Sequence, residues 1–256
     1  MLIDNLKGNF RFLKGRNPFS SGAVADAGYE IVRAVFDPML PLDAGFAGIE
    51  GHLGAIGRSL NALSGMELRI PQALSLEGFQ RFNQSYVQRL AAWGIYVGDL
   101  NPVARTNVAV EINPAPVASV YGFSYTVPSM QTRSTFVISG APEVSVSGAD
   151  QRTVVAPGDV SPEGMRQKIA QVLNSLHLLL QEIRASWADA TAVCVYTVQD
   201  IHPYLEDMLL REVPSANIHG ITWHYARPPV ADADFEMDVR RVFQESRRRG
   251  LGRRLR

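Results

Sequence analysis

Apolar residues recur every three or four positions in three long segments, which is the spacing of one face of a helix. These segments are residues 48–63, 75–94 and 161–184. Ser75 and Ser161 stand where an N-cap is expected, and Pro162 follows at a first helical position. The pattern therefore predicts three helices, and a fourth over residues 200–213 that has a proline near its start.

Short apolar runs and alternating segments mark the predicted strands. They cover residues 9–14, 28–36, 65–71, 101–112, 118–127, 134–140, 191–200, 219–226 and 234–239. Both halves of the chain show strands and helices in a similar order, and the polar segment 126–134 separates them. We expect an α+β protein with two similar domains, residues 1–130 and 131–245, and a basic tail over residues 246–256.

The predicted strand 101–112, NPVARTNVAVEI, has two contrasting faces. One face carries Thr106, Val108, Val110 and Ile112, and the other carries Arg105, Asn107, Ala109 and Glu111. We expect the apolar face to cover the helices of the first half. The polar face is then expected to line a cleft between the domains.

Composition and charge indicate the cellular compartment of the chain and the partners it can bind. It has 256 residues, 46% of them hydrophobic, and a single cysteine, Cys194, which fits a reducing compartment. We see no secretory signal and no apolar stretch of about 20 residues, so a cytoplasmic location is expected. Residues 240–256 hold eight arginines and one acid, Glu245. This basic end is either a nucleic-acid arm or a solvated terminus, and the acidic body argues against extended nucleic-acid binding.

Three stretches resemble the Rid proteins, the reactive intermediate deaminases also called the YjgF-like family. They are STFVISGAPE, the run MRQKIAQVLNSLHLLLQEIRASWADATAVCVYTVQDI, and GFQRFNQSYVQRL followed by NPVARTNVAVEI. The resemblance covers both halves and implies two tandem, chorismate-mutase-like domains, each a mixed sheet with two helices on one face. It also implies a homotrimer with sites in the clefts between domains.

The same resemblance implies a chemistry. Rid proteins hydrolyse imines or enamines of carboxylic acids to a ketone and ammonia, without a metal or an organic cofactor. Some relatives deaminate 2-aminomuconate-type compounds in aromatic ring degradation, and longer tandem relatives act on chorismate. The expected partner is thus a small-molecule carboxylate, with no membrane and no nucleic acid.

Arg105 occupies the position of the family's carboxylate-binding arginine. A planar guanidinium offers two parallel hydrogen bonds to a carboxylate, so an arginine fixed on a strand can hold an acid in one orientation. Asn107 shares its face. The alternative is an exposed ion pair with a nearby acid such as Glu111, which contributes only about 0–1 kcal/mol.

Glu236 matches the family's acid on the last strand. Imine hydrolysis needs a group that deprotonates water and protonates the leaving amine, although an outward-facing strand acid would show the same alternation. The arginine lies in the first half and the acid in the second, so the site is either composite, lost in part, or served by Glu111 instead. His219 lies near the position of the missing second arginine.

Ser139 and Gly140 match the family's Ser-Gly turn that lines the cleft, as do Ser21 and Gly22. A glycine there lets a ligand approach the backbone closely. We find no metal-binding motif, and His219 and His224 fall on opposite faces of their predicted strand. Cys194 is expected to be a small core residue.

These observations favour a cofactor-independent deaminase of an unsaturated amino carboxylic acid, with catalytic residues Glu236 and Glu111. The predicted substrate-binding residues are Arg105, Asn107, Ser139, Gly140 and His219. The alternatives are a chorismate-type hydrolase, which would release pyruvate, and a non-catalytic Rid-like ligand-binding protein. RNA binding through the tail is a further alternative.

Overall fold

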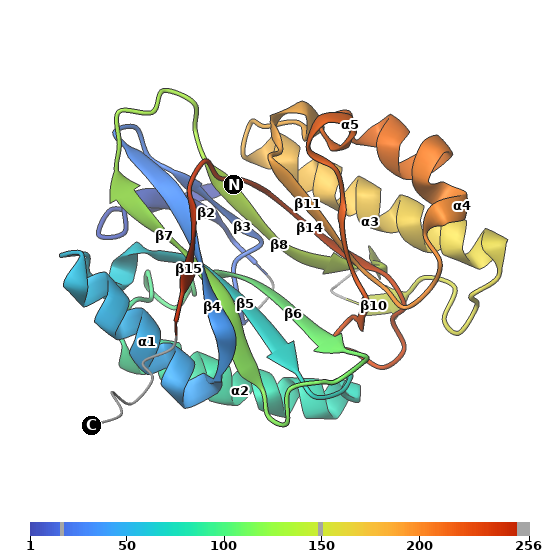
Figure 1. Ribbon diagram of the computed structural model, residues 1–256, viewed down its shortest axis with the longest axis horizontal. Coiled ribbons are helices and arrows are strands. Elements are labelled where there is room, and N and C mark those ends of the chain that lie inside the picture. Colours follow the sequence, from blue (N-terminus) through green and yellow to red (C-terminus); the bar gives the residue numbers. More distant parts are fainter. Residues whose placement is uncertain (16–17, 148–150, 250–256) are drawn as a thin grey trace.

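The computed structural model describes residues 1–15, 18–147 and 151–249. Its first layer is a six-stranded sheet in the order β13-β6-β5-β7-β4-β15, with two helices on one face (Figure 1). The strands are β4 (Tyr29–Pro41), β5 (Leu63–Ile70), β6 (Ala104–Val110), β7 (Ser119–Pro128), β13 (Ala226–Arg227) and β15 (Glu245–Arg248), and the helices are α1 (Leu42–Ala55) and α2 (Leu76–Ala92). Strand β6 runs parallel to β5, and Arg105 pairs with Met66.

The second layer is a seven-stranded sheet in the order β1-β2-β3-β8-β14-β11-β12. Its strands are β1 (Leu2–Asn5), β2 (Phe10–Leu13), β3 (Gly22–Ala25), β8 (Phe136–Pro142), β11 (Ala192–Tyr196), β12 (Thr222–His224) and β14 (Glu236–Arg241). Its outer face is covered by α3 (Pro162–Glu182), α4 (His202–Tyr204), the π-helical η3 (Leu205–Leu210) and α5 (Ala216–His219). Short pieces outside the sheets are η1 (Leu60–Ala62), η2 (Trp187–Asp189) and the hairpin β9 (Val144–Ser147) with β10 (Gln151–Val154).

Helices α2 and α3 begin where their sequences predict. The Ser75 and Ser161 side chains each accept a hydrogen bond from a backbone N–H of the first turn, at 3.1 Å and 3.2 Å. This satisfies one of the donors that a helix start leaves unpaired. Helix α1 differs from the prediction, because it begins at Leu42 and ends before the 3-10 turn that contains Leu60.

The two sheets lie face to face, with the helices on the two outer sides (Figure 1). Each sheet buries an apolar core beneath its own helices, one under α3 and the other under α1 and α2. Between the sheets, an apolar cluster that includes Phe10 and Ile31 fills one end. The centre of this layer is polar, since it holds the buried side chains of Arg33, Glu67 and Asp238.

The strands are exchanged between the two halves of the chain. Strands β1 to β3 lie in the sheet that contains β8, β11 and β14, while β13 and β15 lie in the sheet of the first half. A mixed α+β architecture is therefore present, but the sheets do not follow a boundary at residue 130. The two-domain Rid layout stays a prediction.

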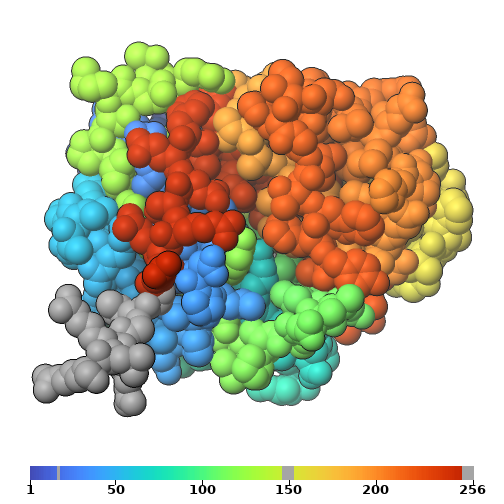
Figure 2. Space-filling view, viewed as in Figure 1, coloured from blue at the N-terminus to red at the C-terminus, as the bar shows by residue number. Residues whose placement is uncertain are grey.

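The basic end of the chain is largely part of the fold. Strand β14 continues to Arg241, and β15 pairs in parallel with β4, so the chain to Arg248 is neither an arm nor a frayed terminus. Figure 2 shows this red segment against the blue residues of the first half. The expectation for a free tail was wrong for residues 246–248, and residues 250–256 lie outside the described residues.

Candidate active site

Strand β6 sets the positions of the candidate residues. Arg105 points toward α2, where it contacts Phe82 and Tyr86, whereas the Thr106 hydroxyl donates to Asp238 of the opposite sheet at 2.8 Å. Val108 likewise packs against the opposite sheet. The alternation of the two faces is as predicted, but their orientation was wrong: the face of Arg105 meets a helix and the face of Thr106 meets the layer between the sheets.

The Arg105 guanidinium is enclosed by aromatic rings. The ring centroids of Phe19, Phe79, Phe82 and Tyr86 lie 4.5–5.8 Å from its carbon Cζ. Only 2% of the residue is exposed, and burial lowers its pKa to about 10. Nη2 donates to Asn83 Oδ1 at 2.8 Å, but Nε and Nη1 are buried with no partner among the described residues. A buried cation with two free N–H groups is suited to receive a carboxylate.

Glu236 lies on β14, in the sheet opposite β6 and in the other half of the chain. A Cβ built on Gly140 would overlap the Glu236 oxygen Oε1 and would lie 3.2 Å from Thr106 Cγ2. The other carboxyl oxygen, Oε2, is buried and has no partner within the described part of the chain. Burial raises the pKa of Glu236 well above its ordinary value, and repulsion from Asp238 adds to this, while Arg105 and Arg69 partly offset it. The surroundings of Glu236 therefore favour its protonated form.

On β8, Ser139 contacts the backbone of Arg105, and Gly140 lies against the carboxyl of Glu236. The Ser139 Oγ accepts from the backbone N–H of Arg105 at 2.9 Å and donates to the Ser20 carbonyl at 2.6 Å. Both residues lie within β8 rather than in a turn, which corrects the prediction of a strand that ends there. Gly140 is required because a side chain at this point would displace the Glu236 carboxyl.

Asn107 adds further unpaired polar atoms. It lies on the same face of β6 as Arg105 and is buried, and neither atom of its amide has a hydrogen-bond partner in the described structure. The side chains of Arg105, Asn107 and Glu236 thus leave buried donors and acceptors open. Buried polar atoms are nearly always paired in folded proteins, so such a group marks a place for a ligand or water.

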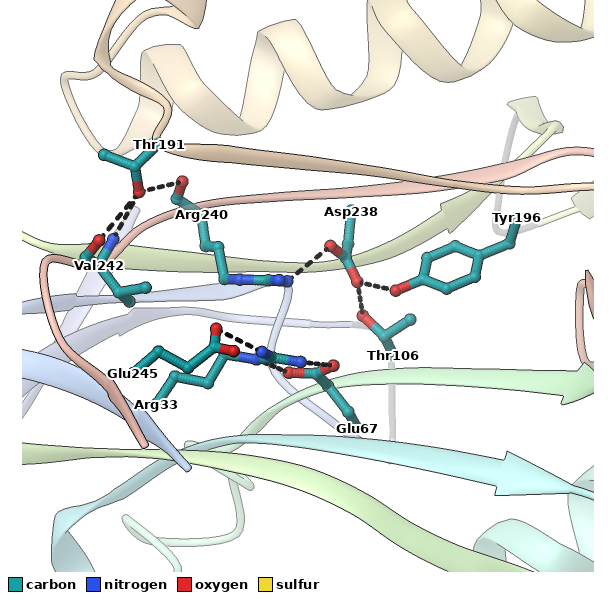
Figure 3. A network of polar contacts seen from close by, with 9 residues as sticks. All are labelled: Arg33, Glu67, Thr106, Thr191, Tyr196, Asp238, Arg240, Val242 and Glu245. Atoms are coloured by element: carbon teal, nitrogen blue, oxygen red, sulfur yellow. Dashed lines mark hydrogen bonds and ion pairs between the residues drawn. The ribbon is translucent and has the colours of Figure 1, made fainter. Parts of the chain in front are cut away.

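A network of hydrogen bonds extends from this site between the sheets (Figure 3). Asp238 accepts from the hydroxyls of Thr106 and Tyr196, each at 2.8 Å, and forms an ion pair with Arg240 at 3.3 Å. A cavity of about 20 Å³ lies beside it, lined in part by Ser139, Thr106 and Asp238. This volume suffices for one water molecule. Sequence reasoning missed this network, although the alternation of Asp234, Glu236 and Asp238 was its visible signal.

Glu111 and His219 lie apart from this group. Glu111 follows the end of β6 and forms an ion pair with Arg227 at 2.8 Å, in which both side chains are partly exposed. The bond to Arg227 lowers the pKa of Glu111, so the group is ionised. His219 is exposed and is the last residue of α5. The prediction that it lies in a strand over residues 219–226 was wrong, because the observed strand β12 covers only Thr222–His224. The structure therefore brings together Arg105, Asn107, Ser139, Gly140 and Glu236 but neither of these two residues.

Three further features of the described residues concern metal binding, membranes and the single cysteine. They contain no group of three or more His, Cys, Asp or Glu side chains arranged to hold a metal ion. None of the helices within the described ranges has the length and apolar character needed to cross a membrane. Cys194 is buried, and its pKa is raised to about 12 by burial, which suits a core residue.

Comparison with known proteins gives the family. Among solved structures, a chorismatase aligns with 90% of this chain and 79% of its own, at 13% identity and a TM-score of 0.49. A 2-amino-5-chloromuconate deaminase of Comamonas testosteroni is 38% identical over 242 residues, which cover 93% of this chain and 96% of that protein. The family described as 2-aminomuconate deaminase CnbZ matches residues 2–246. The chain therefore belongs to the CnbZ family of 2-aminomuconate deaminases and is an enzyme that acts on C–N bonds.

Proposed function

We propose that this enzyme hydrolyses the enamine or imine of an unsaturated 2-amino acid of the 2-aminomuconate type to the keto or enol acid and ammonia. The observation that carries the proposal is the buried guanidinium of Arg105, of which Nε and Nη1 are unpaired, together with the buried carboxyl of Glu236, whose pKa the charge of Arg105 lowers in part. The family and the 38% identical relative support the same substrate class.

Arg105 binds the carboxylate next to the reacting carbon. A carboxylate binds along one edge of the guanidinium, where the second N–H of Nη2, whose first goes to Asn83, donates one hydrogen bond and the free Nε or Nη1 donates the other, which fixes the plane of the substrate. The aromatic rings around it exclude water, and this strengthens the ion pair. The Asn107 amide and the unpaired Glu236 oxygen are the other groups open to the substrate.

Glu236 transfers the protons. In its protonated form it donates a proton to C3 of the enamine, and the C2–N bond becomes an iminium. The resulting carboxylate takes a proton from water as the water oxygen forms its bond to C2, and it passes that proton to the amine nitrogen. The C–N bond then breaks to release ammonia, the C2 hydroxyl returns its proton to Glu236, and the carbonyl forms. A carboxyl with a raised pKa is suited both to donating a proton to the substrate and to taking one from water.

The test is ammonia release from 2-aminomuconate by the wild type and by Arg105→Met, which keeps the bulk of the side chain and removes its charge. We expect kcat/KM to fall by about 10²-fold or more, because two charged hydrogen bonds are lost. The matched control is Arg81→Met on α2, since Arg81 forms only an exposed ion pair with Glu77. Equal activity in Arg105→Met and the wild type would disprove the proposal, and pyruvate release from chorismate in place of ammonia would favour the hydrolase alternative.

A further inference from the structure

Strand β8 carries a β-bulge beside the candidate site. The pairing of β14 with β8 shifts by one residue between Met237 and Val239. Ser139 and Gly140 of β8 therefore lie opposite the single residue Asp238 of β14. An extra residue of this kind bends its strand and changes the direction of the side chains around it. The bulge thus gives the sheet an irregular surface where β6 approaches it.

The edge of β6 lies against this bulge. The backbone N–H of Arg105 donates to Ser139 Oγ at 2.9 Å. A Cβ built on Gly140 would overlap Glu236 Oε1 and would lie 3.2 Å from Cγ2 of Thr106. Because Gly140 has no side chain, the Glu236 carboxyl occupies this space. These contacts bring the edge of β6 close to the carboxyl of Glu236.

A hydrogen bond between two buried side chains joins β6 to β14. Thr106 Oγ1 donates to Asp238 Oδ2 at 2.8 Å. The same oxygen accepts from the Tyr196 hydroxyl at 2.8 Å, and Oδ1 forms an ion pair with Arg240 at 3.3 Å. Donors from β6, β11 and β14 thus hold the Asp238 carboxylate in one orientation.

The bonded pair is close in sequence to both candidate residues. Thr106 directly follows Arg105, and Asp238 lies two residues after Glu236, on the same face of β14. The bond therefore joins the strand of the arginine to the strand of the acid. A displacement of about 1 Å between bound substrate and a catalytic group can lower the rate by about 10²-fold. The Thr106–Asp238 bond is thus placed to control a distance on which the reaction depends.

We propose that Thr106 and Asp238 are positioning residues of the deaminase, which fix the strand of Arg105 relative to the carboxyl of Glu236. This assignment rests on the proposed function. Neither residue touches the substrate: Asp238 anchors the Thr106 hydroxyl, and Thr106 holds β6 against the bulge. When the bond is lost, Arg105 still binds the substrate carboxylate, but the reacting carbon no longer lies in line with the proton of Glu236.

The experiment compares Thr106→Val, which keeps the shape of the side chain and removes its hydroxyl, with Thr106→Ser, which keeps the hydroxyl. For Thr106→Val we expect kcat for ammonia release from 2-aminomuconate to fall by about 10- to 100-fold, with KM within about twofold of the wild-type value. Thr106→Ser should keep kcat within about threefold of the wild type. An unchanged kcat in Thr106→Val, a change confined to KM, or an equal loss in Thr106→Ser would overturn the assignment.

Tyr196→Phe is the matched control. The Tyr196 hydroxyl donates to the same oxygen of Asp238 and at the same distance as Thr106, but Tyr196 lies on β11, in the same sheet as β14. Its loss therefore leaves the bond between the two sheets in place, and we expect kcat to stay within about threefold of the wild type. Equal losses in Thr106→Val and Tyr196→Phe would show that the bond to β6 has no separate role.

Hydrogen exchange separates this inference from the proposed function. If the wild type releases no ammonia from 2-aminomuconate, the proposed function fails, and the position of β6 is then tested without a substrate. We expect peptides from β6 to exchange at least about tenfold faster in Thr106→Val than in the wild type and Thr106→Ser, whereas peptides from α3 keep their rate. Equal rates for β6 in Thr106→Val and the wild type would reject the positioning role. Thr106→Cys, whose thiol is a weak donor, replaces Thr106→Val if that variant does not fold, and it should show a smaller increase.

Discussion

At the scale of single residues, the candidate site depends on groups that the rest of the protein leaves without partners. Arg105 is surrounded by rings instead of acids, and burial and the nearby Asp238 raise the pKa of Glu236. Under the proposed function, the open hydrogen-bonding positions of these two side chains receive the substrate.

Gly140 gives the sharpest test at this scale. In Gly140→Ala the added methyl would overlap the Glu236 carboxyl, so we expect kcat for ammonia release to fall by at least about 10-fold while the protein stays folded. The control is Gly51→Ala in α1, where the new methyl meets no atom within 4 Å and should stabilise the helix by about 0.5–1 kcal/mol. Full activity in Gly140→Ala would show that the position of Glu236 does not matter.

The raised pKa of Glu236 also predicts how stability depends on pH. The folded protein keeps a proton that the unfolded chain releases near pH 4.5, so this contribution is fully present below that pH and is lost as pH rises through the folded pKa. Glu236→Gln mimics the neutral form, and its stability relative to the wild type should increase with pH, by up to about 1.4 kcal/mol per pH unit.

Urea unfolding between pH 5 and 9 measures this difference. Glu111→Gln serves as the control, because the pKa of Glu111 is lowered and the group does not titrate in this range. Parallel stability curves for Glu236→Gln and the wild type would contradict a raised pKa.

At the scale of elements, a buried ionic triad joins α3 to the start of β14. Lys168 is fully buried and pairs with Asp234, and its Nζ lies 3.6 Å from Glu143 Oε1. Glu143 accepts the backbone N–H groups of Asp234 and of Phe235, the residue directly before Glu236. The triad therefore holds the segment that places Glu236.

Lys168→Met should destabilise the protein by about 3–5 kcal/mol, because the buried carboxyl of Glu143 and the partly buried carboxylate of Asp234 lose their cation. Arg166→Met on the same helix is the matched control, since Arg166 forms an exposed pair with Asp207 that contributes about 0–1 kcal/mol. Chemical denaturation of the two variants gives the comparison. Similar losses in both would show that the triad is not a specific anchor.

Strand β6 shows which structural features a sequence pattern predicts and which it does not. Period-two alternation identifies the strand and the residues that share each face, because these follow from backbone geometry. It does not reveal which face meets the helices. We assigned the apolar face to them, but Arg105 lies against the aromatic rings of α2, and Thr106 bonds to the opposite sheet. Tertiary packing decides this, and the alternating acids of β14 do not show by themselves that they face another sheet.

At the scale of the whole molecule, the two halves share their sheets and the candidate site. Strands β1 to β3 join the second-half sheet, and β13 and β15 join the first-half sheet, which no local pattern predicts because these pairings are long-range. The sequence did indicate that Arg105 and Glu236 belong to different halves, and the structure brings them to one place. The 2-aminomuconate deaminase class is confirmed by the family. Rid superfamily membership and a homotrimer stay predictions.

The central claim is that Arg105 and Glu236 of one chain act together on the C–N bond. The most direct measurement is ammonia release from 2-aminomuconate by Arg105→Met, by Glu236→Gln, and by the two variants unfolded together and refolded as an equimolar mixture. We predict that each variant and the mixture retain less than about 1% of the wild-type kcat/KM, since no chain in the mixture holds both groups. Wild-type activity in either variant alone, or activity regained in the mixture, would contradict this account.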